Sequence, residues 1–103
     1  MSDGKVYNGE FKENKFEGIG ELKWPGGNMV YMGSFRAGIR HGAGIMTYPG
    51  GKMFEGTWVD GKEEGEGTLI TRGRRIEGVW KEGVIVSTKD PNIKIDSFKS
   101  LIK

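Results

Sequence analysis

The sequence contains no cysteine, which excludes disulfide bonds, thiolate zinc sites and a cysteine nucleophile. Long apolar runs are also absent. The longest unbroken one, residues 29–32, is far shorter than the roughly 20 residues that a membrane-spanning helix needs. Residues 1–5 lack the apolar core of a signal peptide. We therefore expect a soluble protein of the cytoplasm.

Most of the chain lacks excess charge of either sign. Residues 1–83 hold 12 Lys and Arg against 12 Asp and Glu, so the formal net charge of +2 comes from residues 84–103, with four Lys and two Asp. Nucleic-acid binding draws most of its non-specific affinity from phosphate contacts, which need a basic face. The neutral body of the chain therefore argues against a nucleic-acid partner.

Glycine is abundant, with 19 residues in 103, about 18% where about 7% is usual. Three prolines and the absence of Gly-X-Y triplets exclude collagen. The glycines instead recur in a repeat. An aromatic-x-Gly-x-aromatic signal appears as Tyr7-x-Gly9-x-Phe11, Tyr31-x-Gly33-x-Phe35, Phe54-x-Gly56-x-Trp58 and, with isoleucine first, Ile76-x-Gly78-x-Trp80. These signals start at intervals of 24, 23 and 22 residues.

Each of the first three signals is followed by a Gly-x-Gly pair and a turn. The pairs are Gly18/Gly20, Gly42/Gly44 and Gly65/Gly67, and the turns lie at residues 25–27, 49–51 and 72–74. Residues two apart in a strand share a face, so Tyr7, Gly9 and Phe11 point to one side. A tight turn at residues 12–15, with Asn14 tolerating the left-handed conformation, then returns the chain. Each unit is therefore predicted to be an antiparallel β-hairpin.

The strand glycines indicate how the hairpins are held together. Glycine inside a strand costs stability, so we expect a neighbouring aromatic ring to lie over each missing side chain. One hairpin alone is marginally stable, so the hairpins must stack side by side. The prediction is an all-β fold, a single-layer twisted antiparallel sheet of at least seven strands over residues 1–88 with two open edges.

The last residues, 89–103, differ from the repeats. Glycine disappears after Gly83, residues 84–86 suit a last short strand, and residues 89–92 suit a turn. Apolar Phe98, Leu101 and Ile102 follow Asp96 and Ser97, which predicts one or two helical turns. This tail either caps the open end of the sheet or docks into another protein or subunit.

The repeat resembles the MORN repeat (membrane occupation and recognition nexus) over residues 3–83, as three full copies and one half copy. The resemblance implies a rod of stacked hairpins with a non-enzymatic scaffold or adaptor role, in assembly, dimerisation and peptide recognition. It also implies a cytoskeletal or ciliary setting. The family name implies peripheral membrane or phosphoinositide binding as the alternative.

Two sets of side chains are candidate binding residues. The aromatic groove residues are Tyr7, Phe11, Tyr31, Phe35, Phe54, Trp58 and Trp80, and the alternative for these rings is packing between repeats. Arg72, Arg74 and Arg75 form one compact basic cluster, which either binds a phosphate group or is simply solvated.

No motif for catalysis, a cofactor or a metal is found in the sequence. His41 is the only histidine, and a transition-metal site would need further histidine or cysteine ligands. The carboxylates of Glu63, Glu64 and Glu66 adjoin a turn and fit a solvated loop. The Gly-x-Gly pairs lack the third glycine of a dinucleotide-binding loop. We expect a non-enzyme whose partner is another protein or a second copy of itself. Weak contact with anionic lipid is a further expected interaction.

Overall fold

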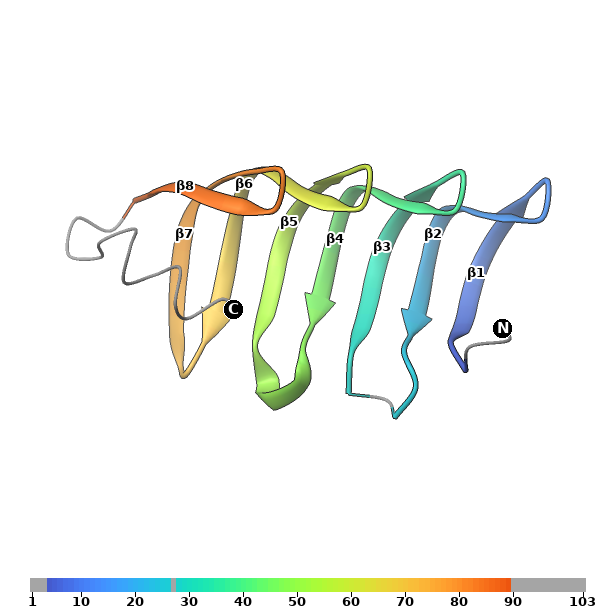
Figure 1. Cartoon of the computed structure of the whole chain (residues 1–103), viewed down its shortest axis with the longest axis horizontal. Helices are drawn as coiled ribbons and strands as arrows, with labels where there is room; N and C mark the ends of the chain where they lie inside the picture. The colour runs from blue at the N-terminus through green and yellow to red at the C-terminus, as the bar shows by residue number, and fades with distance from the viewer. Residues whose placement is uncertain (1–3, 27, 90–103) are drawn as a thin grey trace.

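The computed structural model describes residues 4–26 and 28–89, which form one open sheet of eight antiparallel strands (Figure 1). Every strand pairs with its neighbours in chain order. The strands are β1 (Val6–Lys12), β2 (Lys15–Lys23), β3 (Val30–Arg36), β4 (Ile39–Thr47), β5 (Met53–Val59), β6 (Lys62–Thr71), β7 (Arg74–Lys81) and β8 (Val84–Thr88), with a 3-10 turn at Pro49–Gly51. The predicted single-layer hairpin sheet is confirmed, and β8 completes a fourth hairpin. The helix predicted in the tail lies outside the described residues.

Two rows of turns border the sheet. The inner turns join the two strands of each hairpin and lie along the upper edge of Figure 1, and the outer turns join successive hairpins along the lower edge. The first inner turn uses Glu13 and Asn14, with φ of 52° and 65°. Positive φ at both central residues is the geometry of a two-residue hairpin turn whose twist matches that of the strands. Asn14 therefore adopts the left-handed conformation expected of it.

The described residues contain no helix that is long and apolar enough to cross a membrane.

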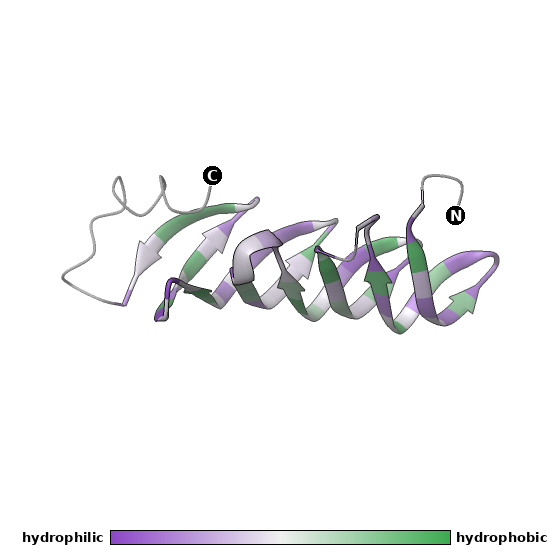
Figure 2. Cartoon of the chain, turned by 90° about the horizontal axis from the view of Figure 1, so that it is seen from below, coloured by the Kyte–Doolittle hydropathy of each residue, from purple (hydrophilic) through white to green (hydrophobic). Residues whose placement is uncertain are grey.

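The strands bend because each hairpin carries a register shift. In the first three hairpins the shift lies between Gly9 and Phe11, Gly33 and Phe35, and Gly56 and Trp58. A bulge of this kind bends its strand and increases its twist. Figure 2 accordingly shows the strands as arcs.

Contacts between opposite strand ends identify the inner side of this bend. Arg40 lies near the start of β4, just after the inner turn, and Trp24 lies just after the end of β2, at the opposite edge of the sheet. The guanidinium group of Arg40 is nevertheless only 5.9 Å from the centroid of the Trp24 ring. Arg40 pairs with Phe35, which pairs with Gly18, so in a flat sheet the two positions would be separated by six residues of strand, about 20 Å. The face that carries both side chains is therefore concave, and we call the opposite face convex.

A continuous row of glycines crosses the sheet at the bend. Gly9, Gly20, Gly33, Gly44, Gly56, Gly67 and Gly78 pair in succession across β1 to β7, and the row ends at Thr88 in β8. Tyr7, Tyr31 and Phe54 lie over this row, and a Cβ on Gly67 would come 2.5 Å from Phe54 Cζ. The predicted covering of glycine by aromatic rings is confirmed in three hairpins. In the fourth, the side chain nearest to a Cβ on Gly78 is that of Ile85, at 3.1 Å.

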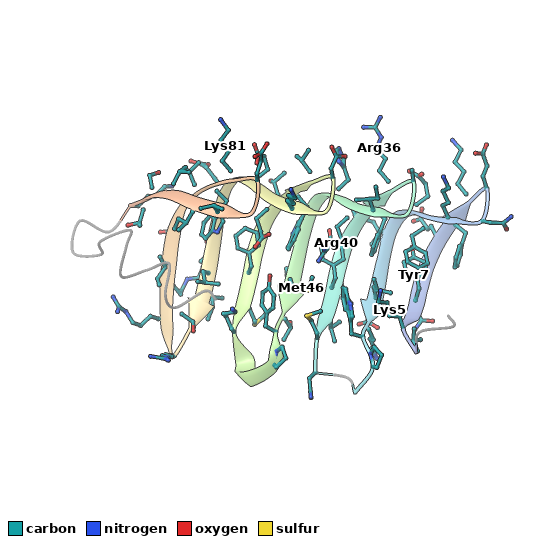
Figure 3. The ribbon with its side chains drawn as sticks, in the orientation of Figure 1. Lys5, Tyr7, Arg36, Arg40, Met46 and Lys81 are labelled. Atoms are coloured by element: carbon teal, nitrogen blue, oxygen red, sulfur yellow. The ribbon has the colours of Figure 1, made fainter. Side chains whose placement is uncertain are left out.

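The hydrophobic core lies on the concave face alone. Its buried members are Leu22, Tyr31, Phe35, Met46, Phe54, Trp58, Leu69, Ile76, Trp80 and Ile85. Figure 3 shows Tyr7, Arg40 and Met46 over this broad face, whereas Arg36 and Lys81 project beyond the inner-turn edge. A single curved layer thus buries a core without a second layer, since its own bend encloses the rings.

Candidate interaction surface

Five of the seven predicted groove residues are buried in the core. These are Tyr31, Phe35, Phe54, Trp58 and Trp80. The second ring of each later hairpin packs edge-on against the leading ring of the hairpin before it. The ring centroids are 5.3 Å apart for Tyr7 and Phe35, 5.4 Å for Tyr31 and Trp58, and 4.8 Å for Phe54 and Trp80. These side chains therefore pack the repeats together, and a partner cannot reach the five buried rings on the folded surface.

The other two predicted groove residues, Tyr7 and Phe11, lie in the edge strand β1. Phe11 is exposed and Tyr7 is half-buried. Tyr7 stacks on Phe16 with 3.8 Å between ring centroids and 9° between ring planes. Its hydroxyl donates a hydrogen bond of 2.7 Å to the carbonyl of Glu10. The accessible part of the predicted groove is therefore at the β1 end of the concave face.

The concave face carries a further row of accessible apolar side chains, three rings and one methionine, that lie outside the predicted set of groove residues. Phe16, Trp24, Met29 and Tyr48 are half-buried and pack against the core from its rim. Trp24 and Tyr48 each stand directly before a Pro-Gly turn, one repeat apart. That recurring aromatic-Pro-Gly sequence is a signal that could have found them. Together with Tyr7 they give the concave face an apolar strip that solvent reaches.

Arg40 lies within this apolar strip. Its guanidinium carbon is 4.9 Å from the Trp58 ring centroid and 6.0 Å from that of Tyr31, which is within reach of cation–π attraction. Its Nη2 donates to the carbonyl of Gly61 at 3.0 Å. The bend of the sheet creates this arrangement, and local sequence does not indicate it.

Two lysines lie over rings of the same face. Lys5 Nζ is 5.8 Å from the Trp24 ring centroid, and Lys52 Nζ is 4.6 Å from that of Tyr48. The apolar strip is thus accompanied by three positive charges, counting Arg40.

A small pocket of about 70 Å³ lies between the strand ends on the concave face, lined by Tyr48, Lys52, Glu63 and Trp80 among others. Loss of solvation on burial raises the pKa of Glu63, while Arg40 and Lys52 oppose the rise. Burial raises the pKa of Tyr48 to about 12, as it does for Tyr31. Pockets for small-molecule ligands are typically about 300–1,000 Å³. This one is too small to enclose a substrate.

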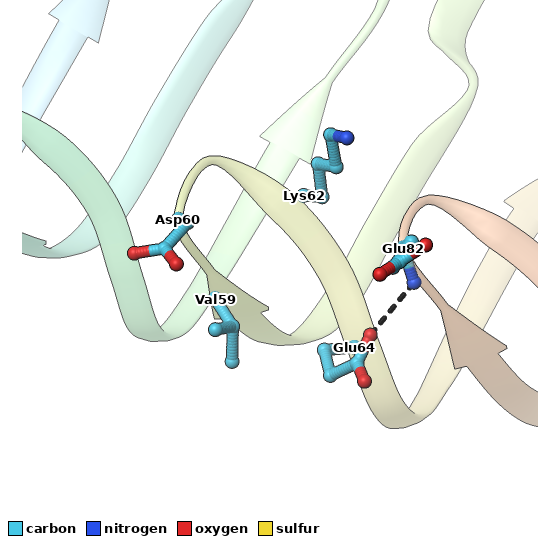
Figure 4. Close-up of a pocket in the computed structure, with 5 residues that line it drawn as sticks. All are labelled: Val59, Asp60, Lys62, Glu64 and Glu82. Carbon is cyan, nitrogen blue, oxygen red and sulfur yellow. Dashed lines mark hydrogen bonds between the residues drawn. The ribbon is translucent and has the colours of Figure 1, made fainter.

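The acidic residues near the inner turns have a structural role. At the pocket in Figure 4, the backbone N–H of Glu82 donates to Glu64 Oε2 at 2.7 Å. The N–H of Ala37 donates to Glu17 Oε1 at 3.2 Å in the corresponding place. Each carboxylate therefore ties its hairpin to the next inner turn. Sequence reasoning assigned Glu64 to a solvated loop and did not find this contact.

The predicted arginine cluster lies at the turn between β6 and β7. Arg72, Arg74 and Arg75 are all exposed. Arg74 and Arg75 are successive residues of β7, so their side chains leave opposite faces of the sheet. The strand therefore does not direct all three guanidinium groups to one point. Within residues 4–26 and 28–89, no group of three His, Asp or Glu side chains could hold a metal ion.

Comparison with known proteins agrees with this architecture. A search of curated protein sequences found no match to the chain. A sequence profile of the MORN repeat matches residues 7–29, 31–53 and 54–72, which contain the three hairpins with complete Gly-x-Gly pairs. The matches cover more than half of the chain. MORN repeats are non-catalytic modules associated with interaction with proteins and membranes. The chain belongs to the MORN-repeat family.

Proposed function

We propose that this protein is a non-enzymatic scaffold or adaptor that binds a partner protein along its concave face. The observation that carries the proposal is the strip of half-buried rings at Phe16, Trp24 and Tyr48, which remains accessible although the rest of the concave face is packed. Amphipathic rings held by a rigid support are the usual anchors of protein interfaces. The curved sheet supplies that support.

The shape of the strip favours an extended protein segment as its partner. The accessible rings are spaced along several hairpins, and the pocket beside Tyr48, at about 70 Å³, is smaller than the pockets that usually hold small-molecule ligands. Lys5, Arg40 and Lys52 lie over ring faces along the same route. We expect the bound segment to carry apolar side chains for the rings and carboxylates for these cations.

The cellular setting is part of the same proposal. The resemblance to cytoskeletal and ciliary MORN scaffolds supports a cytoplasmic protein that acts as a subunit of a larger complex. In that role the chain would hold its partners in a fixed arrangement and would itself catalyse no reaction.

Affinity capture with matched variants tests the proposal. Trp24→Ser together with Tyr48→Ser removes two accessible concave rings. Met32→Ser together with Ile45→Ser removes two exposed apolar side chains from the convex face. We expect the concave pair to reduce the yield of captured partners about tenfold or more and the convex pair to leave it unchanged. Thermal melting establishes that each variant is folded. Equal capture by both folded variants would refute the concave-face proposal.

Binding to anionic membranes is the second candidate. It is favoured by the exposure of Arg72, Arg74 and Arg75 at a single outer turn. Guanidinium groups bind phosphates well, but arginines on opposite faces cannot all contact one headgroup. We therefore propose at most a weak, salt-sensitive attachment that accompanies protein binding.

A further inference from the structure

Trp24 and Tyr48 occupy equivalent positions, one hairpin apart, on the apolar strip of the concave face. Each directly follows the second strand of its hairpin and precedes a Pro-Gly turn. Their backbone N–H groups donate to the carbonyls of Met29 and Lys52, at 3.0 Å and 2.7 Å, which extends the strand pairing at both outer turns. Two strand spacings separate β2 from β4, so the two positions recur at about 10 Å across the sheet.

Both side chains carry a hydrogen-bond donor that the folded protein does not use. The hydroxyls of Tyr7 and Tyr31 and the indole N–H of Trp58 all donate to main-chain carbonyls of this chain. Among the residues that the structure describes, the Trp24 indole N–H and the Tyr48 hydroxyl have no such partner. No buried side-chain nitrogen or oxygen atom in the same part of the chain lacks a partner, so both donors reach solvent.

The Tyr48 hydroxyl is only partly solvated, because burial raises its pKa to about 12. A donor that is partly withdrawn from water and has no protein partner gains more from an added acceptor than a fully hydrated donor does. Each of the two positions therefore offers a bound segment a half-buried ring together with a hydrogen-bond donor.

The spacing and the donors together select the conformation of the bound segment. In an α-helix, side chains seven residues apart are about 10.5 Å apart on one face, but the main-chain carbonyls are bonded within the helix. In a β-strand the carbonyls are available, but side chains on one face recur at about 6.6 Å and 13 Å. A polyproline II helix repeats every three residues, about 9.3 Å, and has no internal hydrogen bonds. Of the three, it alone supplies a side chain for each ring and a carbonyl for each donor.

We propose that Trp24 and Tyr48 form a recognition site for a polyproline II segment of the partner protein. Prolines three residues apart pack on the two rings, and main-chain carbonyls of the segment accept hydrogen bonds from the indole N–H and the hydroxyl. Proline fixes this conformation before binding, which lowers the entropic cost of association. The positive charges of Lys5, Arg40 and Lys52 at the same rings favour acidic residues between the prolines. This inference rests on the proposed concave-face function and adds the class of segment that is bound.

Two synthetic peptides of identical composition test the spacing. The first repeats Pro-Ala-Asp four times, and the second contains the same residues in an order that places no two prolines three residues apart. We expect the first peptide to bind the full chain saturably below about 1 mM and the second to bind at least about fivefold more weakly. On binding, the nuclear magnetic resonance signal of the Trp24 indole N–H should move, whereas that of Trp58, which donates to the Gly44 carbonyl, should not.

Variants that remove one donor each test the hydrogen bonds. Tyr48→Phe keeps the ring and loses the hydroxyl, so it should weaken binding of the first peptide about two- to tenfold. Trp24→Phe should have an effect of similar size. Tyr31→Phe is the matched control, because the Tyr31 hydroxyl already donates to the Ser34 carbonyl and its ring is wholly buried. Thermal melting establishes that each variant is folded, and we expect the control to bind the peptide as the parent protein does.

Each other outcome contradicts the inference. Absence of binding at millimolar peptide would exclude the polyproline site, and equal binding of the two peptides would exclude the three-residue spacing. Equal affinity of the folded Tyr48→Phe and Tyr31→Phe variants would exclude the role of the free donor. Affinity capture with Trp24→Ser and Tyr48→Ser reports on the concave face separately. Capture that depends on these rings, together with no peptide binding, would overturn this inference and leave the proposed function intact.

Discussion

The ring of Tyr31 occupies the space that a side chain on Gly44 would need. A Cβ on Gly44 would come 2.5 Å from Tyr31 Cζ and 2.6 Å from Cε1. Corresponding relationships join Tyr7 to Gly20 and Phe54 to Gly67. The Tyr31 ring also packs edge-on against Trp58 of the next hairpin. One aromatic residue per repeat therefore covers main chain in its own hairpin and fixes the neighbouring one.

Gly44→Ala should destabilise the fold by about 1–3 kcal/mol, the usual cost of forcing an extra carbon into a packed core. The new methyl must displace the Tyr31 ring, which is wholly buried and in contact with Trp58. Chemical denaturation measures the free energy of unfolding. Loss of near-ultraviolet circular dichroism would report the displaced rings.

Gly50→Ala is the matched control for this substitution. Gly50 has φ of 85° and no atom within 4 Å of an added Cβ, so the substitution tests backbone strain without crowding. We expect roughly 1–2 kcal/mol and no change in the aromatic signal. If Gly44→Ala left that signal unaltered, the covering ring would not be a rigid part of the core.

Tyr31→Phe should cost about 0.5–1.5 kcal/mol because it removes one hydrogen bond. The Tyr31 hydroxyl donates to the carbonyl of Ser34 at 2.9 Å, beside the register shift of β3. Phe54 occupies the corresponding place without a hydroxyl. Phe54→Tyr is therefore the reciprocal variant and should gain stability by up to a similar amount. Loss of stability in both variants would mean that ring packing, and not the hydroxyl, dominates.

The sequence was sufficient to predict the strands, because their signals are local. Alternation with a period of two places Tyr7, Gly9 and Phe11 on one face, and the turn glycines end each strand. The covering of Gly20 by Tyr7 also followed, since an interior glycine needs compensation. These features are repeated in each unit, so the copies reinforced one another.

The curvature was not predictable from these local signals, and it decides which rings are accessible. In a flat sheet Trp58 would line an open groove, as the sequence suggested. The bend at the register shifts instead encloses Trp58 and brings Arg40 to Trp24. The directions of the side chains in the arginine cluster were likewise not predictable, because they depend on where the turn ends and the strand begins. Since β7 begins at Arg74, the side chains of Arg74 and Arg75 leave opposite faces of the sheet.

Alkaline pH should unfold the protein through its buried tyrosines. Burial raises the pKa of Tyr31 and of Tyr48 from 10.0 to about 12. A raised pKa means that the folded state holds a proton that the unfolded chain has already lost. The contribution of Tyr31 and Tyr48 to the free energy of unfolding is therefore full below pH 10 and is lost as the pH rises toward 12. Denaturation midpoints across this range, with ultraviolet titration of phenolate, measure the effect.

Tyr48→Phe provides the control for the alkaline transition because it removes one of the tyrosines whose pKa burial raises, the others being Tyr31 and Tyr7. The variant should lose less stability between pH 10 and 12 than the parent protein. Phenolate absorbance that rises fully near pH 10 in the folded protein would contradict the burial of these hydroxyls.

Glu64→Ala should weaken the junction between the third and fourth hairpins. The carboxylate accepts from the Glu82 N–H at 2.7 Å, so its removal should cost about 0.5–1.5 kcal/mol and speed hydrogen exchange at that amide. Glu66→Ala is the control. Its carboxylate lies 3.8 Å from Lys89 Nζ in an exposed pair, which contributes at most about 1 kcal/mol. Unchanged exchange at Glu82 in the first variant would exclude the tether.

Sedimentation with vesicles tests the contribution of the outer-turn arginines to membrane binding. Replacing Arg72, Arg74 and Arg75 by Glu should abolish any binding to vesicles rich in anionic phospholipid. Arg36→Glu with Lys81→Glu is the control at the inner-turn edge (Figure 3). Binding through the arginines should also fall steeply between low and physiological salt, because exposed charges are screened beyond about 8–10 Å. Equal loss in both variants would indicate a general charge effect, and no sedimentation of the parent protein at low salt would rule out the membrane proposal.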